Sequence, residues 1–97
     1  MRQVEFKQRA INAIDAVCEF IETQNTPGSS VKWYNELIKF IVKRSGTTII
    51  KFPLCNHHKF AAKRYSCFVY KKQWVIVFKY TDSKLTVYQF VHGSRLK

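Results

Sequence analysis

The sequence predicts an α+β fold in which an N-terminal strand and a helical hairpin pack on a C-terminal antiparallel β-meander. Apolar residues recur at helical spacing in the first half, and three apolar runs separated by short polar turns follow in the second. The 97 residues, of which 46% are hydrophobic, suffice for one packed core. We therefore expect a single domain over residues 1–97, of the type in which one helical layer covers a small sheet.

Two helices are expected after a short opening strand at residues 3–6. The first spans about residues 8–23, and its apolar stripe comprises Ile11, Ile14, Val17, Cys18 and Ile21. The run Asn25-Thr26-Pro27-Gly28 breaks the pattern, and Thr26 before Pro27 is suited to cap the second helix. That helix is expected to end near Arg44, at Ser45-Gly46. The two stripes predict an antiparallel hairpin that lies on a sheet.

The second half of the chain is expected to hold three strands. Residues 47–64 look irregular and basic, with a possible short strand at 48–52. Strands are then predicted at residues 65–71, 74–80 and 85–92. Lys72-Gln73 and Asp82-Ser83 are the expected turns, so the three strands form a meander.

The pairing of the last two strands follows from their turn. With Asp82-Ser83 as a two-residue turn, opposite residues share a face of the hairpin. One face is apolar and is expected to be core; its pairs are Tyr80–Leu85, Phe78–Val87, Ile76–Gln89 and Trp74–Val91. The other face mixes aromatic and basic residues and suits a binding surface; its pairs are Val75–Phe90, Val77–Tyr88 and Lys79–Thr86. A slip of one residue would exchange the two faces.

The charge of the chain is strongly uneven. Residues 1–30 carry three basic and four acidic side chains, whereas residues 31–97 carry 14 lysines and arginines against Glu36 and Asp82 alone. The total of +11 exceeds the magnitude of roughly 2–8 that keeps a small domain soluble. This balance favours an acidic partner, either nucleic acid or an acidic protein.

The three cysteines are an odd number, which argues against a disulfide framework. Cys18 and Cys67 fall on apolar positions and are expected to be small core residues. Cys55-Asn56-His57-His58 resembles a metal-binding fragment but lacks a second ligand pair, so we expect a solvated loop and no metal. No apolar run approaches the roughly 18 residues of a membrane span, and the start does not resemble a signal peptide. A cytoplasmic protein is expected.

The order of elements and the closing hairpin WVIVFKY…KLTVYQFVHGSR resemble the RelE/ParE superfamily of type II toxin–antitoxin toxins, the plasmid stabilisation type. The resemblance covers nearly the whole chain. It implies a small basic toxin that inhibits growth and needs no cofactor. It also implies a cognate acidic antitoxin that wraps the sheet and helices. RelE-like members are ribosome-dependent mRNA endonucleases with basic residues on the open face of the sheet, whereas ParE-like members lack that set and poison DNA gyrase.

The basic positions of the RelE-like members can be compared with this chain one at a time. The two lysine positions on the first meander strand correspond to Ser66 and Phe68, and the arginine position early in the second strand corresponds to Val75. Only the late arginine has a match, Arg95. Stabilising the charge at a cleaved phosphate needs several convergent cations. The resemblance therefore implies a ParE-like toxin that binds a gyrase-type protein target.

Two other functions remain open at this point. One is a RelE-like mRNA endonuclease that acts on translating ribosomes, with His92 as acid or base and with Lys79 and Arg95 near the phosphate. The other is a basic module that binds nucleic acid, with the bases of the nucleic acid stacked on exposed Tyr70, Tyr88 or Phe90.

The candidate site residues are drawn from the binding face of the sheet and from its closing segment. His92 and Arg95 are the catalytic candidates, and Gly93 permits a turn that aims Arg95 toward the open face beside Lys79 and His92. The expected binding residues are Phe68, Tyr70, Lys79, Tyr88, Phe90, His92 and Arg95.

Overall fold

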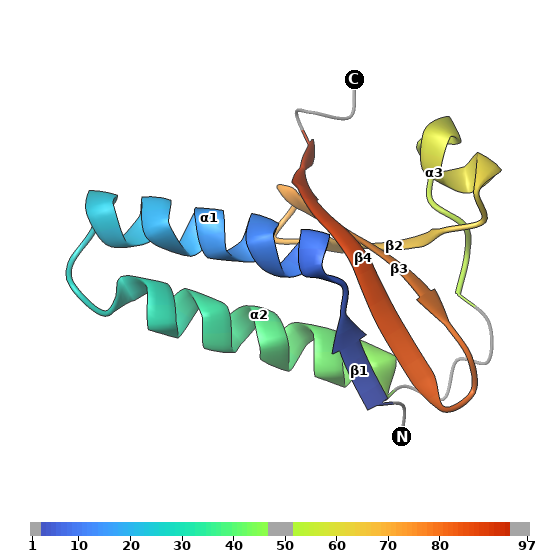
Figure 1. Cartoon of the computed structure of the whole chain (residues 1–97), viewed down its shortest axis with the longest axis horizontal. Helices are drawn as coiled ribbons and strands as arrows, with labels where there is room; N and C mark the ends of the chain where they lie inside the picture. Colours follow the sequence, from blue (N-terminus) through green and yellow to red (C-terminus); the bar gives the residue numbers. More distant parts are fainter. Residues whose placement is uncertain (1–2, 47–51, 94–97) are drawn as a thin grey trace.

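The computed structural model describes residues 3–46 and 52–93 and has the α+β architecture that the sequence predicts (Figure 1). Its elements are β1 (Gln3–Phe6), α1 (Gln8–Gln24), α2 (Ser29–Ser45), α3 (His58–Ala62), β2 (Ser66–Tyr70), β3 (Trp74–Tyr80) and β4 (Lys84–His92). The opening strand, the two long helices and the three meander strands are confirmed, with ends that differ by a residue or so from the predicted ones. In the described part of the chain, no helix is long and apolar enough to cross a bilayer.

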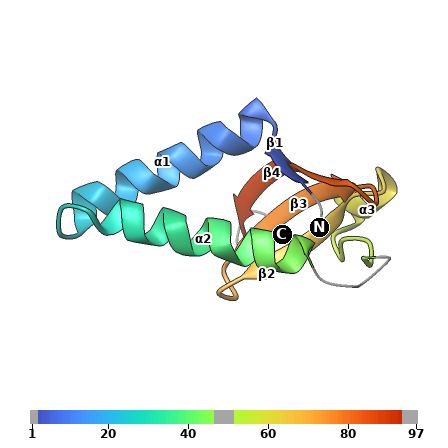
Figure 2. The ribbon, with the colours of Figure 1, turned by 90° about the horizontal axis from the view of Figure 1, so that it is seen from below.

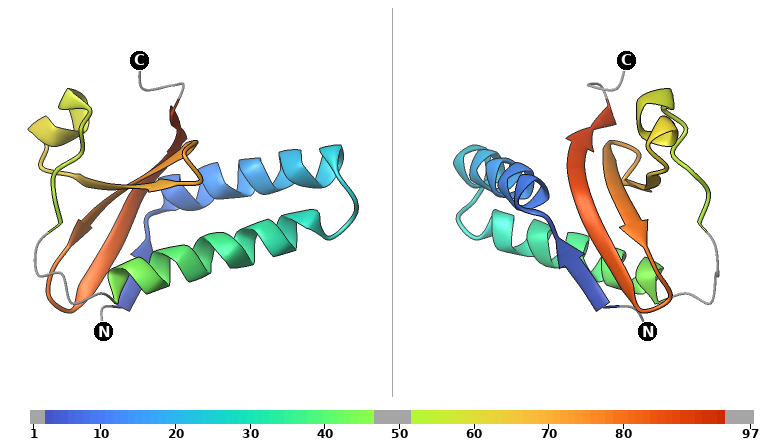
Figure 3. Two further views of the ribbon diagram at one scale, coloured as in Figure 1. Left: turned by 180° about the vertical axis from the view of Figure 1, so that it is seen from behind. Right: turned by 45° about the vertical axis from the view of Figure 1, so that its right-hand side comes forward.

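The four strands form one mixed sheet in the order β1-β4-β3-β2. The meander is antiparallel, and β1 adds to its free edge by pairing parallel to β4, with Val4 opposite Leu85. The helical hairpin and α3 lie on opposite sides of the sheet (Figures 1 and 3). We call the side that carries the hairpin the inner face and the side that carries α3 the outer face.

The main core lies between the hairpin and the inner face. From their connection the two helices diverge, α1 toward β1 and α2 toward β2 (Figure 2). Alternate residues of each strand point to the inner face, where they meet the apolar stripes of both helices. The most deeply buried residues are Ala10, Ile14, Leu37, Ile41, Ile76, Phe78, Leu85 and Val87.

A second, smaller core lies on the outer face. Residues 53–64, which we call the cap segment, lie over β2 and β3 and bury Cys55, Phe60 and Val77 together. The cap segment contains α3, so the expectation of a wholly irregular, solvated region is wrong. His57 accepts a hydrogen bond from the N–H of Lys59 and caps this helix. The strand expected at 48–52 falls, apart from Phe52, outside the described residues.

Cys55 and Cys67 form a disulfide, which corrects the prediction of unpaired cysteines. The sequence pattern assigns Cys67 to a strand and Cys55 to a loop. The fold brings the two together because Leu54 forms a β-bridge with Ser66 beside them. Cys18 on α1 remains a free thiol, and burial raises its pKa, with smaller contributions from Asp15 and Glu22. The three cysteines thus comprise one disulfide pair and one free thiol.

The β3–β4 hairpin contains a bulge that the sequence analysis did not foresee. Near the turn, Tyr80 faces Leu85 and Phe78 faces Val87, as predicted. Beyond Phe78 the register shifts by one residue. The pairs Ile76–Gln89, Trp74–Val91, Val75–Phe90 and Val77–Tyr88 are therefore wrong; the observed pairs are Ile76–Phe90, Trp74–His92, Val75–Val91 and Val77–Gln89. Tyr88 is the extra residue, and a bulge of this kind re-aims the side chains that follow it.

The turn between α1 and α2 is held by a carboxylate rather than by the predicted Thr26 cap. Helix α2 begins after Gly28, which adopts a left-handed conformation (φ 91°). Glu22 at the end of α1 accepts hydrogen bonds from the Gly28 N–H (2.7 Å), the Ser30 N–H and the Ser30 hydroxyl (2.6 Å). These bonds, led by the one from the Ser30 hydroxyl, lower the pKa of Glu22 below its ordinary value. Thr26 and Pro27 precede the helix.

Candidate functional site

The fold separates the predicted site residues instead of gathering them on one surface. Phe68, Tyr70 and Phe90 are buried in the main core, so the prediction that Tyr70 and Phe90 are exposed is wrong. The bulge explains Phe90, because the shifted register turns this side chain from the predicted binding face to the inner face. Arg95 lies outside the described residues.

Lys79 and Tyr88 are on the outer face, as the sequence predicts, and they belong to a cluster there. We call Lys7, Tyr65, Lys79 and Tyr88 the Lys–Tyr patch. The Nζ atom of Lys79 lies 4.8 Å from the centre of the Tyr65 ring and 5.9 Å from that of Tyr88. The Nζ atom of Lys7 approaches the Tyr88 ring from β1 at 5.6 Å, and the two tyrosine rings are 5.3 Å apart. Two ammonium groups thus converge on one aromatic ring.

The charge of the Lys–Tyr patch is not compensated by nearby acids. Glu5 lies beside it but pairs with Lys84, at 3.0 Å between Oε2 and Nζ. Within the described residues, neither Lys7 nor Lys79 has a carboxylate within ion-pair distance. The patch borders a shallow hollow of about 370 Å³ that lies over β1, β3 and β4. It can attract an anionic group and present aromatic surface beside it.

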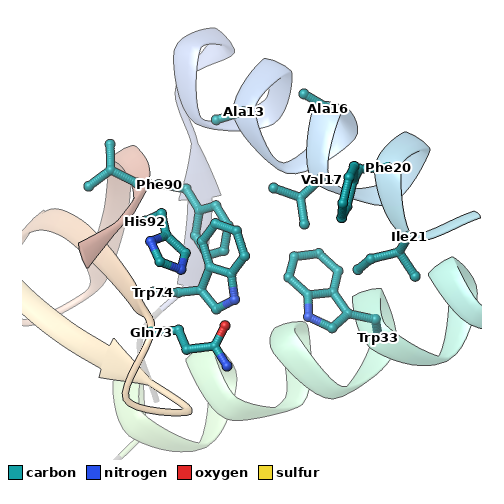
Figure 4. A pocket seen from close by; sticks show the side chains of 11 residues that line it. Ala13, Ala16, Val17, Phe20, Ile21, Trp33, Gln73, Trp74, Phe90 and His92 are labelled. Atoms are coloured by element: carbon teal, nitrogen blue, oxygen red, sulfur yellow. The ribbon is translucent and has the colours of Figure 1, made fainter. Parts of the chain in front are cut away.

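A groove opens at the other end of the sheet, between the helical hairpin and the start of β3 (Figure 4). This helix–sheet groove has a volume of about 730 Å³. Its lining is mostly apolar and comes from α1, α2, β3 and β4: Ala13, Ala16, Val17, Phe20, Ile21, Trp33, Gln73, Trp74, Phe90, Val91 and His92.

Aromatic side chains build the wall of the helix–sheet groove. Trp74 stacks on Phe90 with ring centres 4.9 Å apart, and Trp33 from α2 meets Trp74 edge-on at 6.1 Å. Phe20 lines the opposite side from α1 and is 65% exposed. A large aromatic side chain that lines a hollow at such exposure marks an apolar surface suited to a partner.

His92 belongs to the helix–sheet groove and not to the Lys–Tyr patch. Its ring lies edge-on to Trp74 at 4.9 Å, among the apolar side chains shown in Figure 4. His92 pairs with Trp74 across the hairpin and shares its side of the sheet, whereas Lys79 is on the outer face. The expected meeting of Lys79 and His92 on one open face is therefore wrong, because the bulge moves the end of β4 by one residue relative to β3.

The described residues offer no cluster of histidine, cysteine and acidic side chains able to hold a metal ion. His57 and His58 stack on each other at 4.8 Å at the start of α3, while Cys55 is committed to its disulfide. The hollow beside the disulfide is lined mainly by apolar residues of the cap segment and β2.

Sequence reasoning missed two members of the Lys–Tyr patch and the whole helix–sheet groove. Lys7 follows the predicted first strand, but nothing local indicates that this strand pairs with β4. The sequence pattern assigns Tyr65 to a strand and gives no sign that its ring lies at the edge of a patch. The sequence holds one sign of the groove, which is Phe20. This large aromatic residue lies outside the apolar stripe of α1, and its side chain is 65% exposed in the structure.

Comparison with known proteins assigns no family or function to the chain, because it matches no family model and no curated protein. A functional conclusion therefore depends on the two surfaces just described.

Proposed function

We propose that this protein is the toxin component of a type II toxin–antitoxin pair, of the ParE-like kind that acts by binding a protein target. In this proposal the helix–sheet groove receives an amphipathic helix of the acidic antitoxin. The observation that carries the proposal is the groove itself, a hollow of about 730 Å³ with aromatic walls. Burying aromatic and aliphatic surface of this kind is the main source of affinity when a helix enters a groove.

The charge distribution supports an acidic partner. Residues 31–97 hold 14 basic side chains against two acidic ones, so this part of the chain, which supplies the α2, β3 and β4 sides of the groove, is strongly positive. A partner with an apolar helix face and acidic flanks would be complementary in both respects, and charge would speed its association. The order of strand, helical hairpin and meander agrees with the RelE/ParE resemblance at the level of fold class.

The arrangement gives the mRNA endonuclease little support. Lys79 and His92 face opposite sides of the sheet, and Ser66, Phe68 and Val75 provide no cation at the corresponding positions. A phosphoryl transition state needs its charge stabilised by groups that converge on one point. We therefore favour a toxin that acts by binding over one that cleaves RNA.

Nucleic-acid binding is the second candidate, and the Lys–Tyr patch is the observation that favours it. Paired lysines beside tyrosine rings are typical of surfaces that hold a phosphate backbone and stack bases without sequence preference. Such binding would weaken steeply as salt rises. It would use the outer face and leave the helix–sheet groove free, so the two candidates predict effects at different residues.

Substitutions in the two surfaces test the proposal. The protein is co-expressed with the product of the neighbouring reading frame, and growth and co-purification are measured for wild type, Phe20→Asp and Val31→Asp. Phe20 and Val31 are 65% and 60% exposed on adjacent helices, but only Phe20 lines the groove. We expect Phe20→Asp to lose the partner while Val31→Asp keeps it, with both variants folded.

Equal binding by both variants, or a neighbouring product that does not bind at all, would contradict the proposal. For the second candidate, a Lys7→Ala/Lys79→Ala variant is titrated with a labelled single-stranded oligonucleotide at several salt concentrations. If nucleic acid is the ligand, that variant weakens binding and lowers the salt dependence, whereas Phe20→Asp leaves both unchanged.

A further inference from the structure

The Cys55–Cys67 disulfide fastens the cap segment to the outer face of the sheet. It joins the part of the segment that precedes α3 to β2, the edge strand. Next to it the Cys55 N–H donates to the Tyr65 carbonyl at 2.9 Å, and the Tyr65 N–H donates to the Phe60 carbonyl at 3.0 Å. The cap segment, the disulfide and Tyr65 thus form one connected unit.

Apart from the disulfide, the cap segment is held by the packing of Phe60 in the small core, by the Leu54–Ser66 bridge and by the Cys55–Tyr65 backbone hydrogen bond. Phe60 is its only large buried side chain among residues 53–64, and most of its other side chains are exposed. Helix α3 has five residues, and a helix this short is not stable by itself in water. Arg64 has a φ of 63°, a left-handed conformation that costs a residue with a Cβ atom about 1 kcal/mol.

Tyr65 connects the cap segment to the Lys–Tyr patch. It follows Arg64 directly, contacts Phe60 with a ring separation of 6.3 Å, and contacts Tyr88 at 5.3 Å. It is also the ring closest to Lys79 in the patch, at 4.8 Å. If the cap segment opens, Tyr65 loses its hydrogen bonds to Cys55 and Phe60, and the patch loses one of its two aromatic rings.

We propose that the Cys55–Cys67 pair is a redox switch that opens and closes the cap segment and thereby assembles or dismantles the Lys–Tyr patch. Opening requires a dithiol reductant. Its thiolate attacks the half-buried Cys67 sulfur, the S–S bond breaks, and the Cys55 thiolate leaves and takes up a proton. The second thiol of the reductant then releases Cys67 from the mixed disulfide, so that two electrons and two protons reach the protein and the reductant becomes a cyclic disulfide.

The switch reconciles the disulfide with the expected cytoplasmic location. Disulfides are rare in the cytoplasm, where thiol systems keep cysteines reduced, and those that form there are usually transient and serve catalysis or redox sensing. In such a compartment the pair rests as thiols with the cap segment loosened, and oxidation closes it. The inference goes beyond the proposed toxin function and does not depend on it, because its test reads the conformation of the cap segment itself.

The test compares the oxidised protein with protein treated with dithiothreitol. Lys59, Lys63 and Arg64 are exposed trypsin sites that lie between the two cysteines in sequence. We expect cleavage at these sites to become at least about tenfold faster on reduction, because cross-linking a loop of this length stabilises its closed state strongly. Nuclear Overhauser contacts between the Tyr65 and Tyr88 rings should disappear at the same time.

Two variants control the experiment. Cys55→Ser/Cys67→Ser should behave like the reduced protein with or without dithiothreitol, while the amide protons of β3 and β4 stay protected and show that the fold is intact. Cys18→Ser, which removes the free thiol on α1, should respond to reduction like wild type. Cleavage rates that do not change on reduction would overturn the switch. Faster cleavage with the Tyr65–Tyr88 contacts unchanged would overturn its connection to the Lys–Tyr patch.

Discussion

Replacing Tyr80 with phenylalanine removes the two hydrogen bonds that tie the backbone of Phe52, the residue just before the cap segment, to the sheet. The Tyr80 hydroxyl accepts from the Phe52 N–H at 2.7 Å and donates to the Phe52 carbonyl at 3.4 Å. Phe52 is buried, and its ring lies 4.9 Å from that of Tyr80 and 5.4 Å from those of Phe68 and Phe78. The substitution Tyr80→Phe keeps this aromatic packing, so its effect isolates the hydroxyl.

The expected loss follows from the burial of the partner. A buried amide left without its hydrogen bond costs about 1–3 kcal/mol, so the free energy of unfolding should fall by about that amount. For a domain of this size each kcal/mol lowers the Tm by roughly 4–8 °C. Urea denaturation and thermal melting measure both quantities. Tyr34→Phe is the matched control, because Tyr34 on α2 is 42% exposed and its change should stay within about 0.5 kcal/mol. An unchanged Tm for Tyr80→Phe, or an equal loss for Tyr34→Phe, would refute this reasoning.

Three further outcomes are expected, each measurable by the same denaturation experiments. Lys72→Gly should stabilise the protein by up to about 1 kcal/mol, since Lys72 has a left-handed φ of 60° that glycine adopts without strain; a loss of stability would show that the lysine side chain contributes contacts of its own. Leu37→Ala should cost about 2–5 kcal/mol, because Leu37 is fully buried between the helix and the sheet, and a cost below 1 kcal/mol would mean that the core collapses around the cavity. Glu22 has a lowered pKa in the folded protein, so its hydrogen bonds with Ser30 and Gly28 stabilise the protein at pH values above the ordinary pKa of glutamate. This stabilisation is lost as the pH falls through the lowered pKa of the folded protein. The free energy of unfolding of Glu22→Gln should therefore be lower than that of wild type near pH 7, and the two values should converge in acid. A difference in unfolding free energy that does not change with pH would contradict the role of the carboxylate.

Local patterns in the sequence were sufficient for most of the secondary structure. The apolar stripes of α1 and α2 and the apolar run of β3 predicted these elements within a residue or two. Each helix buries one face, whereas β3 is buried on both faces, with Ile76, Val77 and Phe78 fully shielded from water. The pairs Tyr80–Leu85 and Phe78–Val87 were also predictable, since a tight turn sets the register of the residues nearest to it. The turn between β2 and β3 was harder to predict. It is formed by residues 71–73, and both Lys71 and Lys72 adopt a left-handed conformation. Glycine, the usual sequence signal for that conformation, is absent from this turn.

Features that depend on distant segments were decided only by the tertiary structure. The bulge at Tyr88 changed the face of Phe90 and separated His92 from Lys79, and no local pattern marks the extra residue. The Cys55–Cys67 disulfide depends on the cap segment folding back over β2. Lys7 reached the patch because β1 pairs parallel to β4, across nearly the full length of the chain. Sequence periodicity reports which face of an element is buried, whereas the meeting of side chains at a site depends on register and distance between elements, which are set only when the whole chain packs.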